Sequence, residues 1–204
     1  MSPVPIREAL RALTADGLVV ALPQRGYRVA PMSIEDMEDT YRLRSTLEPM
    51  AIKLAIPRLS EDDLDAIADA LDQLSDAYAT SDWDAYMVEH RRFHFGIYQA
   101  CGSPWLLRIL GTLWENSMRY HRLSMEQQGV IERRAEEHRK ILDACRARDA
   151  TKAAQLMRAH LDRRTSWVRD FLANPAGYMP RPGGDLADAA RIEAPKNTEQ
   201  DKSP

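Results

Sequence analysis

The feature that most constrains this chain is a long stretch, residues 33–174, that is poor in glycine and rich in residues that favour helices. Five of the nine glycines of the 204-residue sequence lie outside it. Apolar residues recur there at helical spacing, and no part of it alternates apolar and polar residues for long. This pattern predicts six helices, at residues 34–56, 61–79, 82–100, 104–126, 129–147 and 150–173.

Residues that cap helix N-termini stand before most of these segments. They are Ser33, Ser60, Ser81, Ser103 and Asp149. Such side chains accept hydrogen bonds from the free N–H groups of a first helical turn. Short connections between helices favour antiparallel neighbours. The predicted fold class is therefore all-α, an antiparallel bundle of about six helices over residues 33–174.

The two ends of the chain differ from this stretch. Residues 1–31 contain one helix, which is helical by Ile6, followed by apolar segments on either side of a turn at Pro23–Gly26, typical of a β-hairpin. Residues 175–204 hold several prolines and few large apolar residues, so this tail is predicted to be disordered. Three regions follow: 1–31, 33–174 and 175–204.

The basic charge of the chain is concentrated at its start. Residues 1–31 carry four arginines against two acids, a net charge of +2, whereas the whole chain has a net charge of −3. Arg7 and Arg11 lie four residues apart on one helix face. A helix followed by a basic hairpin is how winged helix-turn-helix domains contact DNA. The alternative is a solvated helix with an ordinary surface hairpin.

This first region also resembles a known family. The run Ser2-Pro-Val-Pro-Ile-Arg-Glu-Ala-Leu-Arg-Ala-Leu, then Asp16-Gly-Leu-Val, then Gln24-Arg-Gly-Tyr-Arg-Val, is similar to the end of the winged helix of GntR-family bacterial transcription regulators. The resemblance implies a recognition helix and a wing that contact operator DNA. The implied DNA-binding residues are Ser2, Arg7, Arg11, Arg25 and Gly26.

The family has two further helices before this point, where the present sequence has Met1. Without them, Ile6, Leu10 and Leu13 lack much of their core, and fewer than about 40 residues seldom fold alone. One hypothesis is a start codon placed too far downstream in a longer gene product. The other is a sensor that has lost competent DNA binding.

Four of the five histidines are predicted to face the interior of the bundle. His90 and His94 lie one helical turn apart beside Phe93 and Ile97, and His138 and His160 fall on the apolar faces of two later helices. A lone inward histidine is usually a core residue with a hydrogen-bond partner. Four on three helices predict a divalent metal site, for zinc or nickel.

The same stretch is similar to the all-helical FCD effector domain of the FadR-like branch of GntR regulators. The matching runs are Tyr41 to Glu48, Arg92 to Tyr98 with Gly102-Ser-Pro, Glu137 to Cys145, and Ala154 to His160. In that family an aspartate and three histidines hold a divalent metal. The resemblance implies that His94, His138 and His160 are ligands, with His90 in the position of the aspartate.

This replacement changes the charge of the predicted site. With four neutral histidines the site has a net charge of +2, whereas one aspartate and three histidines leave +1. A small carboxylate effector is therefore expected to bind there. Arg44 could clamp it, or simply pair with Glu48. The resemblance also places Asn116 and Arg119 along the effector cavity, although they equally suit the polar face of an amphipathic helix.

These features together predict a cytoplasmic, homodimeric, ligand-responsive transcription regulator. No apolar run is long enough to cross a membrane, and the two cysteines suit buried thiols in a reducing compartment. A metal-dependent enzyme is the rival class, because histidines can hold a metal that activates water. Four protein ligands suit a closed site better than a catalytic one, so no catalytic residue is predicted.

Overall fold

The computed structural model describes residues 3–123 and 130–174. Within them, seven α-helices, one short 3-10 helix and one two-stranded sheet account for most of the chain. The elements are α1 (Pro3–Ala15), β1 (Val19–Leu22), β2 (Gly26–Val29), α2 (Ile34–Ala55), η1 (Ile56–Arg58), α3 (Glu61–Ala79), α4 (Trp83–Gln99), α5 (Pro104–Leu123), α6 (Val130–Arg146) and α7 (Ala150–Ala173). The prediction of an all-α fold with one early hairpin is confirmed. Within these described ranges, no helix is both long and apolar enough to span a membrane.

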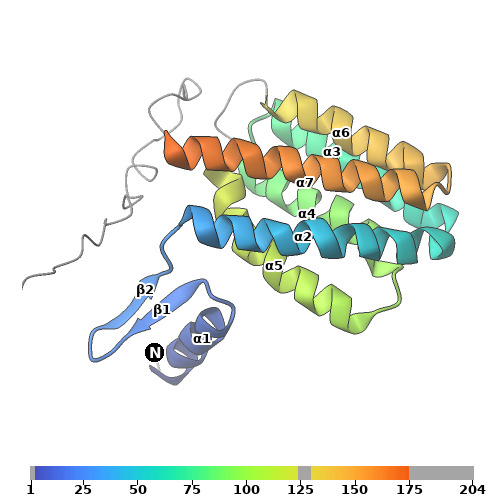
Figure 1. The fold of residues 1–204 in the computed structure, drawn as a ribbon. Coiled ribbons are helices and arrows are strands. Elements are labelled where there is room, and N and C mark those ends of the chain that lie inside the picture. The colour runs from blue at the N-terminus through green and yellow to red at the C-terminus, as the bar shows by residue number, and fades with distance from the viewer. Residues whose placement is uncertain (1–2, 124–129, 175–204) are drawn as a thin grey trace, which may run out of the picture.

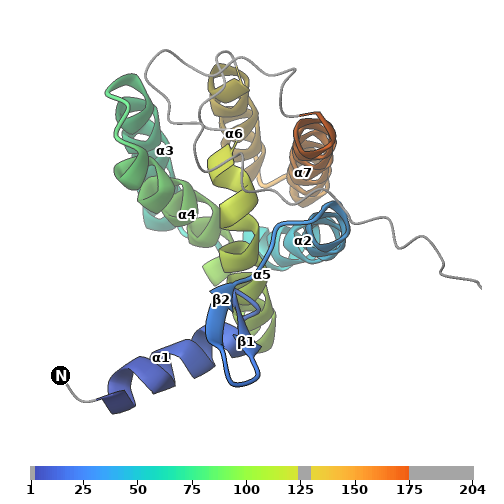
Figure 2. The ribbon, with the colours of Figure 1, turned by 90° about the vertical axis from the view of Figure 1, so that its left-hand side faces the viewer.

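The first helix and the hairpin form a small unit beside the bundle (Figures 1 and 2). Strands β1 and β2 pair antiparallel from Val19 with Val29 to Leu22 with Gly26. Gly26 has a φ of +87° in the turn, a conformation that glycine adopts without strain. Ile6 and Val29 are 55% and 73% exposed, so this unit leaves apolar side chains uncovered.

Helices α2 to α7 form the six-helix bundle, and their N-termini largely follow the predicted caps. Ser33 accepts a hydrogen bond from the backbone N–H of Asp36, Ser60 forms a full capping box with Asp63, and Asp149 accepts from the N–H of Lys152. The prediction of Ser81 as a cap is wrong. Its φ is +57°, which ends the previous turn, so the cap falls one residue later, at Asp82.

Three expectations fall partly outside the described residues. The predicted C-terminal end of the helix at 104–126, the start of the helix at 129–147 and the tail at 175–204 all lie there, at least in part. Within the described ranges, α5 extends to Leu123 and α6 begins at Val130.

Helix α2 contacts three other helices of the bundle. It packs along α7 and also contacts α4 and α5, while α3 packs on α4 and α6 packs on α7 (Figures 1 and 2). The core between these helices contains fully buried aromatic rings, including Tyr41, Phe93 and Trp114. Polar side chains also lie within it, at the level where α4, α6 and α7 approach each other.

Candidate metal centre

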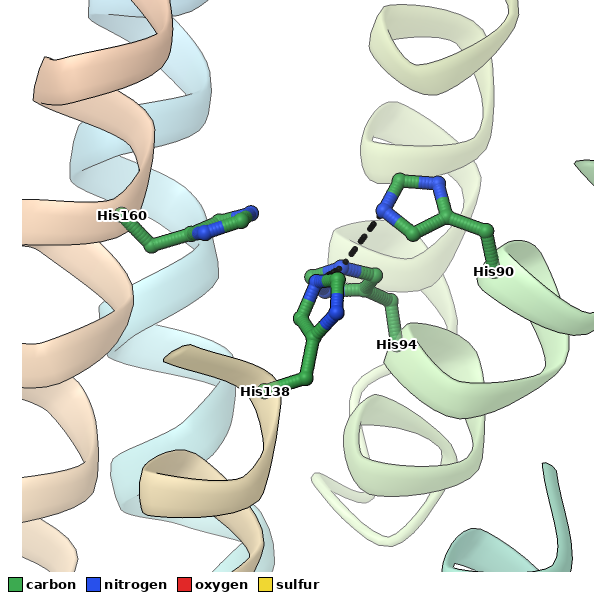
Figure 3. A group of neighbouring side chains, drawn as sticks. All are labelled: His90, His94, His138 and His160. Carbon is green, nitrogen blue, oxygen red and sulfur yellow. Dashed lines mark hydrogen bonds between the residues drawn. The ribbon is translucent and has the colours of Figure 1, made fainter. Parts of the chain in front are cut away.

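Three helices bring four histidines to one point in the bundle. His90 and His94 come from successive turns of α4, His138 from α6 and His160 from α7 (Figure 3). All four side chains are buried. The arrangement follows from helical periodicity, because residues four apart on α4 project from the same face.

The ring nitrogens of these histidines converge. The Nε2 atom of His94 lies 3.1 Å from Nε2 of His90 and 3.2 Å from Nε2 of His138, and the potential ligand atoms of all four residues lie within 4.8 Å of one another. Zinc binds histidine nitrogen at about 2.0–2.1 Å in a tetrahedron, which places neighbouring nitrogens about 3.3 Å apart. The donor set and its spacing therefore fit a divalent ion that prefers imidazole.

A chain of hydrogen bonds orients His94. Its Nδ1 lies 3.1 Å from the hydroxyl of Tyr98, and that hydroxyl donates to Oε2 of Glu48 at 2.6 Å. Burial, and then the Glu48 carboxylate, raise the pKa of Tyr98 well above its ordinary value, so the phenol keeps its proton. Since Tyr98 donates to Glu48, it accepts from Nδ1–H of His94. The Nε2 atom of His94 is then left with a lone pair for a metal.

The other histidines are supported unequally. Nδ1 of His160 lies 2.7 Å from Oε2 of Glu137, whose other oxygen accepts from Arg163 at 2.6 Å. This carboxylate fixes the ring of His160 and leaves its Nε2 for coordination. Nδ1 of His90 is buried and has no hydrogen-bond partner in the part of the chain that the structure describes. The described hydrogen bonds to outer partners therefore orient His94 and His160.

The interior keeps the imidazoles of His90 and His94 neutral. Burial is the main cause that lowers the pKa of His90 and of His94 well below the ordinary value, and neighbouring histidines add to the effect. A neutral imidazole is the form that binds a metal. His90 and His94 are therefore in their coordinating form at neutral pH.

Arg44 lies in the same interior and has partners already. Its Nε donates to Oε1 of Glu48 at 2.5 Å and its Nη1 donates to Oγ of Ser117 at 2.6 Å. Burial alone would lower the pKa of Arg44, but the Glu48 carboxylate together with Tyr41 and Tyr98 outweighs it, so the pKa is raised. The pairing with Glu48 that the spacing allowed is therefore present. Its guanidinium also lies over the rings of Tyr41 and Trp114.

Two of the residues predicted along the effector cavity, Asn116 and Arg119, contact the segments around the hairpin. Nδ2 of Asn116 donates to the backbone carbonyl of Asp16 at 2.5 Å, and Nη1 of Arg119 donates to the carbonyl of Ala30 at 3.1 Å. Arg119 also pairs with Asp36. In the described residues this face of α5 therefore holds the segments around the hairpin, and an effector role of Asn116 and Arg119 stays a prediction.

The residues expected to contact DNA lie on the surface of the small N-terminal unit, with one exception. Arg7, Arg11 and Arg25 are exposed, and Arg11 pairs with Glu8 at 2.9 Å. Gly26 lies at the hairpin turn. Ser2 lies outside the described residues.

Sequence reasoning missed several residues of this interior. His121 is buried on α5, with its ring centroid 4.5 Å from that of His90. Glu137 and Tyr98 orient two of the histidines, and Arg164 lies buried one turn after His160. The burial of Arg164 could have been predicted, since it lies on the same face of α7 as Met157, His160 and Phe171. Tyr98 could also have been found, since it follows His94 by four residues on the same face of α4. No sequence signal connects Glu137 with His160 before α6 and α7 are placed.

Comparisons with known proteins agree with this architecture. Residues 39–163 match the FCD domain family. The chain is 34% identical over 168 residues to the HTH-type transcriptional repressor GlaR of Escherichia coli K12, covering 77% of this chain and 75% of that protein. It is 32% identical over 172 residues to the transcriptional regulator BphR of Paraburkholderia xenovorans LB400, covering 81% and 70%.

Solved structures show the same fold. Escherichia coli McbR/YncC superposes with a TM-score of 0.76 at 22% identity, covering 83% of this chain and 86% of that one. A GntR-family regulator from Pseudomonas syringae pv. tomato DC3000 gives a TM-score of 0.62 at 28% identity, covering 87% and 73%.

Proposed function

Because the chain belongs to the GntR family of transcriptional regulators and carries an FCD domain, we propose that it is a regulator controlled by a divalent metal and a small carboxylate. The prediction that the chain is a transcriptional regulator and not an enzyme is confirmed by its family. The observation that carries the metal proposal is the convergence of the Nε2 atoms of His90, His94 and His138.

His90, His94, His138 and His160 would hold the ion, which we propose to be zinc, with nickel as the other ion that suits the ligands. A divalent ion bound in this site supplies a positive centre that attracts an anionic ligand. The residues of the chain itself hold the imidazoles in place, through Tyr98 and Glu48 for His94 and through Glu137 for His160.

The effector is proposed to be a small organic acid. Four neutral imidazoles leave the charge of a divalent ion uncompensated, and an uncompensated buried charge is costly. Arg44 is proposed as a further contact for the acid. Its hydrogen bonds to Glu48 and Ser117 use two of its five N–H donors and fix the position of the guanidinium.

DNA binding is proposed for α1 and the hairpin. Arg7 and Arg11 lie four residues apart on α1, and Arg25 lies in the hairpin turn, so the exposed cations suit contacts to phosphates. Ser2 and Gly26 keep their family-derived roles as part of this proposal. The DNA is an operator, recognised by a pair of such units.

A homodimer is proposed to supply that pair. Leu43, Met50 and Leu54 form an exposed apolar row along α2, and Trp105 on α5 is 70% exposed. Large exposed apolar side chains in a row mark association surfaces more often than ordinary surface.

The metal proposal is tested by the metal content of the purified protein. We expect about one zinc or nickel ion per chain after loading, and loss of that ion in His138→Ala and in His160→Ala. Arg139→Ala is the matched control, because Arg139 is exposed beside His138 on α6. If the wild-type protein takes up neither metal, the proposal is wrong.

A further inference from the structure

Arg164 is a buried cation with unused hydrogen-bonding capacity. It lies on α7, its side chain is only 5% exposed, and its Nε donates to the hydroxyl of Tyr41 at 3.0 Å. Both terminal nitrogens, Nη1 and Nη2, are buried and have no hydrogen-bond partner among the residues that the structure describes. Four N–H donors at the forked end of the side chain are thus unsatisfied.

The charge of Arg164 is also uncompensated. The charged side chains that are buried in the described residues, apart from the histidines, are Arg44, Glu48 and Arg164. Glu48 is committed to Arg44 at 2.5 Å, so the interior has one positive charge in excess. Arginine keeps its charge in proteins, and burying an unpaired charge is expensive. An anion that comes from outside the chain would remove this cost.

The position of Arg164 relates that anion to the metal site. Arg164 follows His160 by four residues, so both project from the same face of α7, with a rise of about 6 Å between them. Tyr41 connects Arg164 to Arg44, because it accepts from Arg164 while its ring lies 5.1 Å from the Arg44 guanidinium. Two cationic centres, the metal site and Arg164, therefore lie one helical turn apart inside the bundle.

We propose that the effector is a short dicarboxylate, and that Arg164 binds its second carboxylate through Nη1 and Nη2. This inference rests on the proposed function, in which the first carboxylate goes to the metal. A planar guanidinium with two free ends matches the two oxygens of a carboxylate. The separation of one helical turn suits an acid with a short carbon chain between its carboxylates. Arg164 thereby selects dicarboxylates over monocarboxylates of equal length.

The test compares succinate with butyrate, which has four carbons and one carboxylate, by calorimetry on the zinc-loaded protein. We expect succinate to bind the wild-type protein about tenfold or more tightly than butyrate, since hydrogen bonds to a charged group stabilise a complex by about that factor. In Arg164→Gln the affinity for succinate falls to that for butyrate, while butyrate affinity and zinc content do not change. Arg158→Gln, an exposed cation on the same helix, leaves both affinities unchanged.

A second measurement separates ligand binding from a structural role. In the ligand-free protein, Arg164→Gln removes an unpaired buried charge, so its melting temperature should rise, whereas loss of a structural arginine would lower it. If Arg164→Gln does not fold, the wild-type protein alone tests the preference for a dicarboxylate. Succinate should then raise its melting temperature more than butyrate does, and an equal rise would contradict the proposal.

The outcomes distinguish two failures. Equal binding of the two acids by the wild-type protein, with no loss in Arg164→Gln, overturns the assignment of Arg164 and leaves a carboxylate at the metal intact. Failure of both acids to bind the zinc-loaded protein overturns the dicarboxylate and the proposed effector site together.

Discussion

Replacing Glu48 by glutamine should weaken both the fold and the metal site. Glu48 is 1% exposed, and its two oxygens accept from Nε of Arg44 and from the hydroxyl of Tyr98. Glutamine has nearly the same shape, so the substitution removes a charge without creating a cavity. The effects described below therefore come from electrostatics and hydrogen bonding.

The stability effect follows from the charge left behind on Arg44. Removing one partner of a buried ion pair costs about 3–5 kcal/mol, because the other charge stays buried without compensation. For a protein of this size, each kcal/mol shifts the melting temperature by about 2–4 °C. We therefore expect Glu48→Gln to melt roughly 6–20 °C below the wild type when both are metal-free.

The metal effect follows from the tautomer of His94. A glutamine at position 48 that donates its amide to Tyr98 turns the phenol around, and Tyr98 then donates to Nδ1 of His94. The proton of His94 moves to Nε2, which faces His90 and His138. Losing an outer partner of this kind typically weakens metal affinity by about 10–100-fold. Competition with a chelator of known zinc affinity measures the change.

Two further variants check the reasoning. Glu115→Gln breaks an exposed pair with Arg91 and should change the melting temperature by less than about 2 °C. Arg44→Met combined with Glu48→Gln removes the orphaned charge, so it should recover stability while zinc affinity stays low. If Glu48→Gln has the melting temperature of the wild type and binds zinc equally well, the hydrogen bonds from Glu48 through Tyr98 to His94 do not support the site.

Three other results are expected. First, burial lowers the pKa of His90 and His94, so the unfolded chain binds protons that the folded, metal-free protein does not. The free energy of unfolding of the metal-free protein should fall as the pH drops below about 6.5, by up to about 1.4 kcal/mol per pH unit for each histidine. Urea denaturation in the presence of a chelator at pH 7.5, 6.5 and 5.5 measures this change, and an equal free energy of unfolding at all three pH values would contradict it. Second, Gly102 has a φ of +70° and its added Cβ would meet the Arg58 side chain, so Gly102→Ala should lower the free energy of unfolding by about 1–3 kcal/mol. Gly111→Ala, with open space in α5, should raise it by up to about 1 kcal/mol. Third, Arg119→Ala should speed amide hydrogen exchange in residues 19–29, because Arg119 bonds the carbonyl of Ala30, and at the start of α2, because it pairs with Asp36. Unchanged exchange in residues 19–29 would mean that α5 does not hold the hairpin.

The fold could be predicted because its determinants are local. The caps at Ser33, Ser60 and Asp149 and the helical spacing of apolar residues each act within a few positions of the chain, and the helices follow them closely. The error at Ser81 was also local. Two polar residues, Ser81 and Asp82, precede α4, and either could cap it. The left-handed backbone conformation of Ser81, which cannot be predicted from the sequence pattern, leaves Asp82 as the cap.

The candidate site could be predicted only in part. The four histidines were identifiable because each lies on the apolar face of its own helix. Glu48 was not, since it is 50 residues from Tyr98 and meets it only when α2 packs against α4. The contacts of Asn116 and Arg119 could not be predicted for a related reason. Spacing shows which residues share a face of α5, but not which neighbour that face meets.

Helix α5 leaves little freedom for evolutionary change. On one side Trp114 packs against the rings of His90 and His94 and Ser117 accepts from Arg44. On the other side Asn116 and Arg119 hold the segments around the hairpin. A substitution at Trp114 or Ser117, which contact the interior, therefore falls within two residues of Asn116 or Arg119, which hold the segments around the hairpin. We expect lineages that acquire new effectors to change α2 and α7 first, and to change α5 only when the response itself is altered.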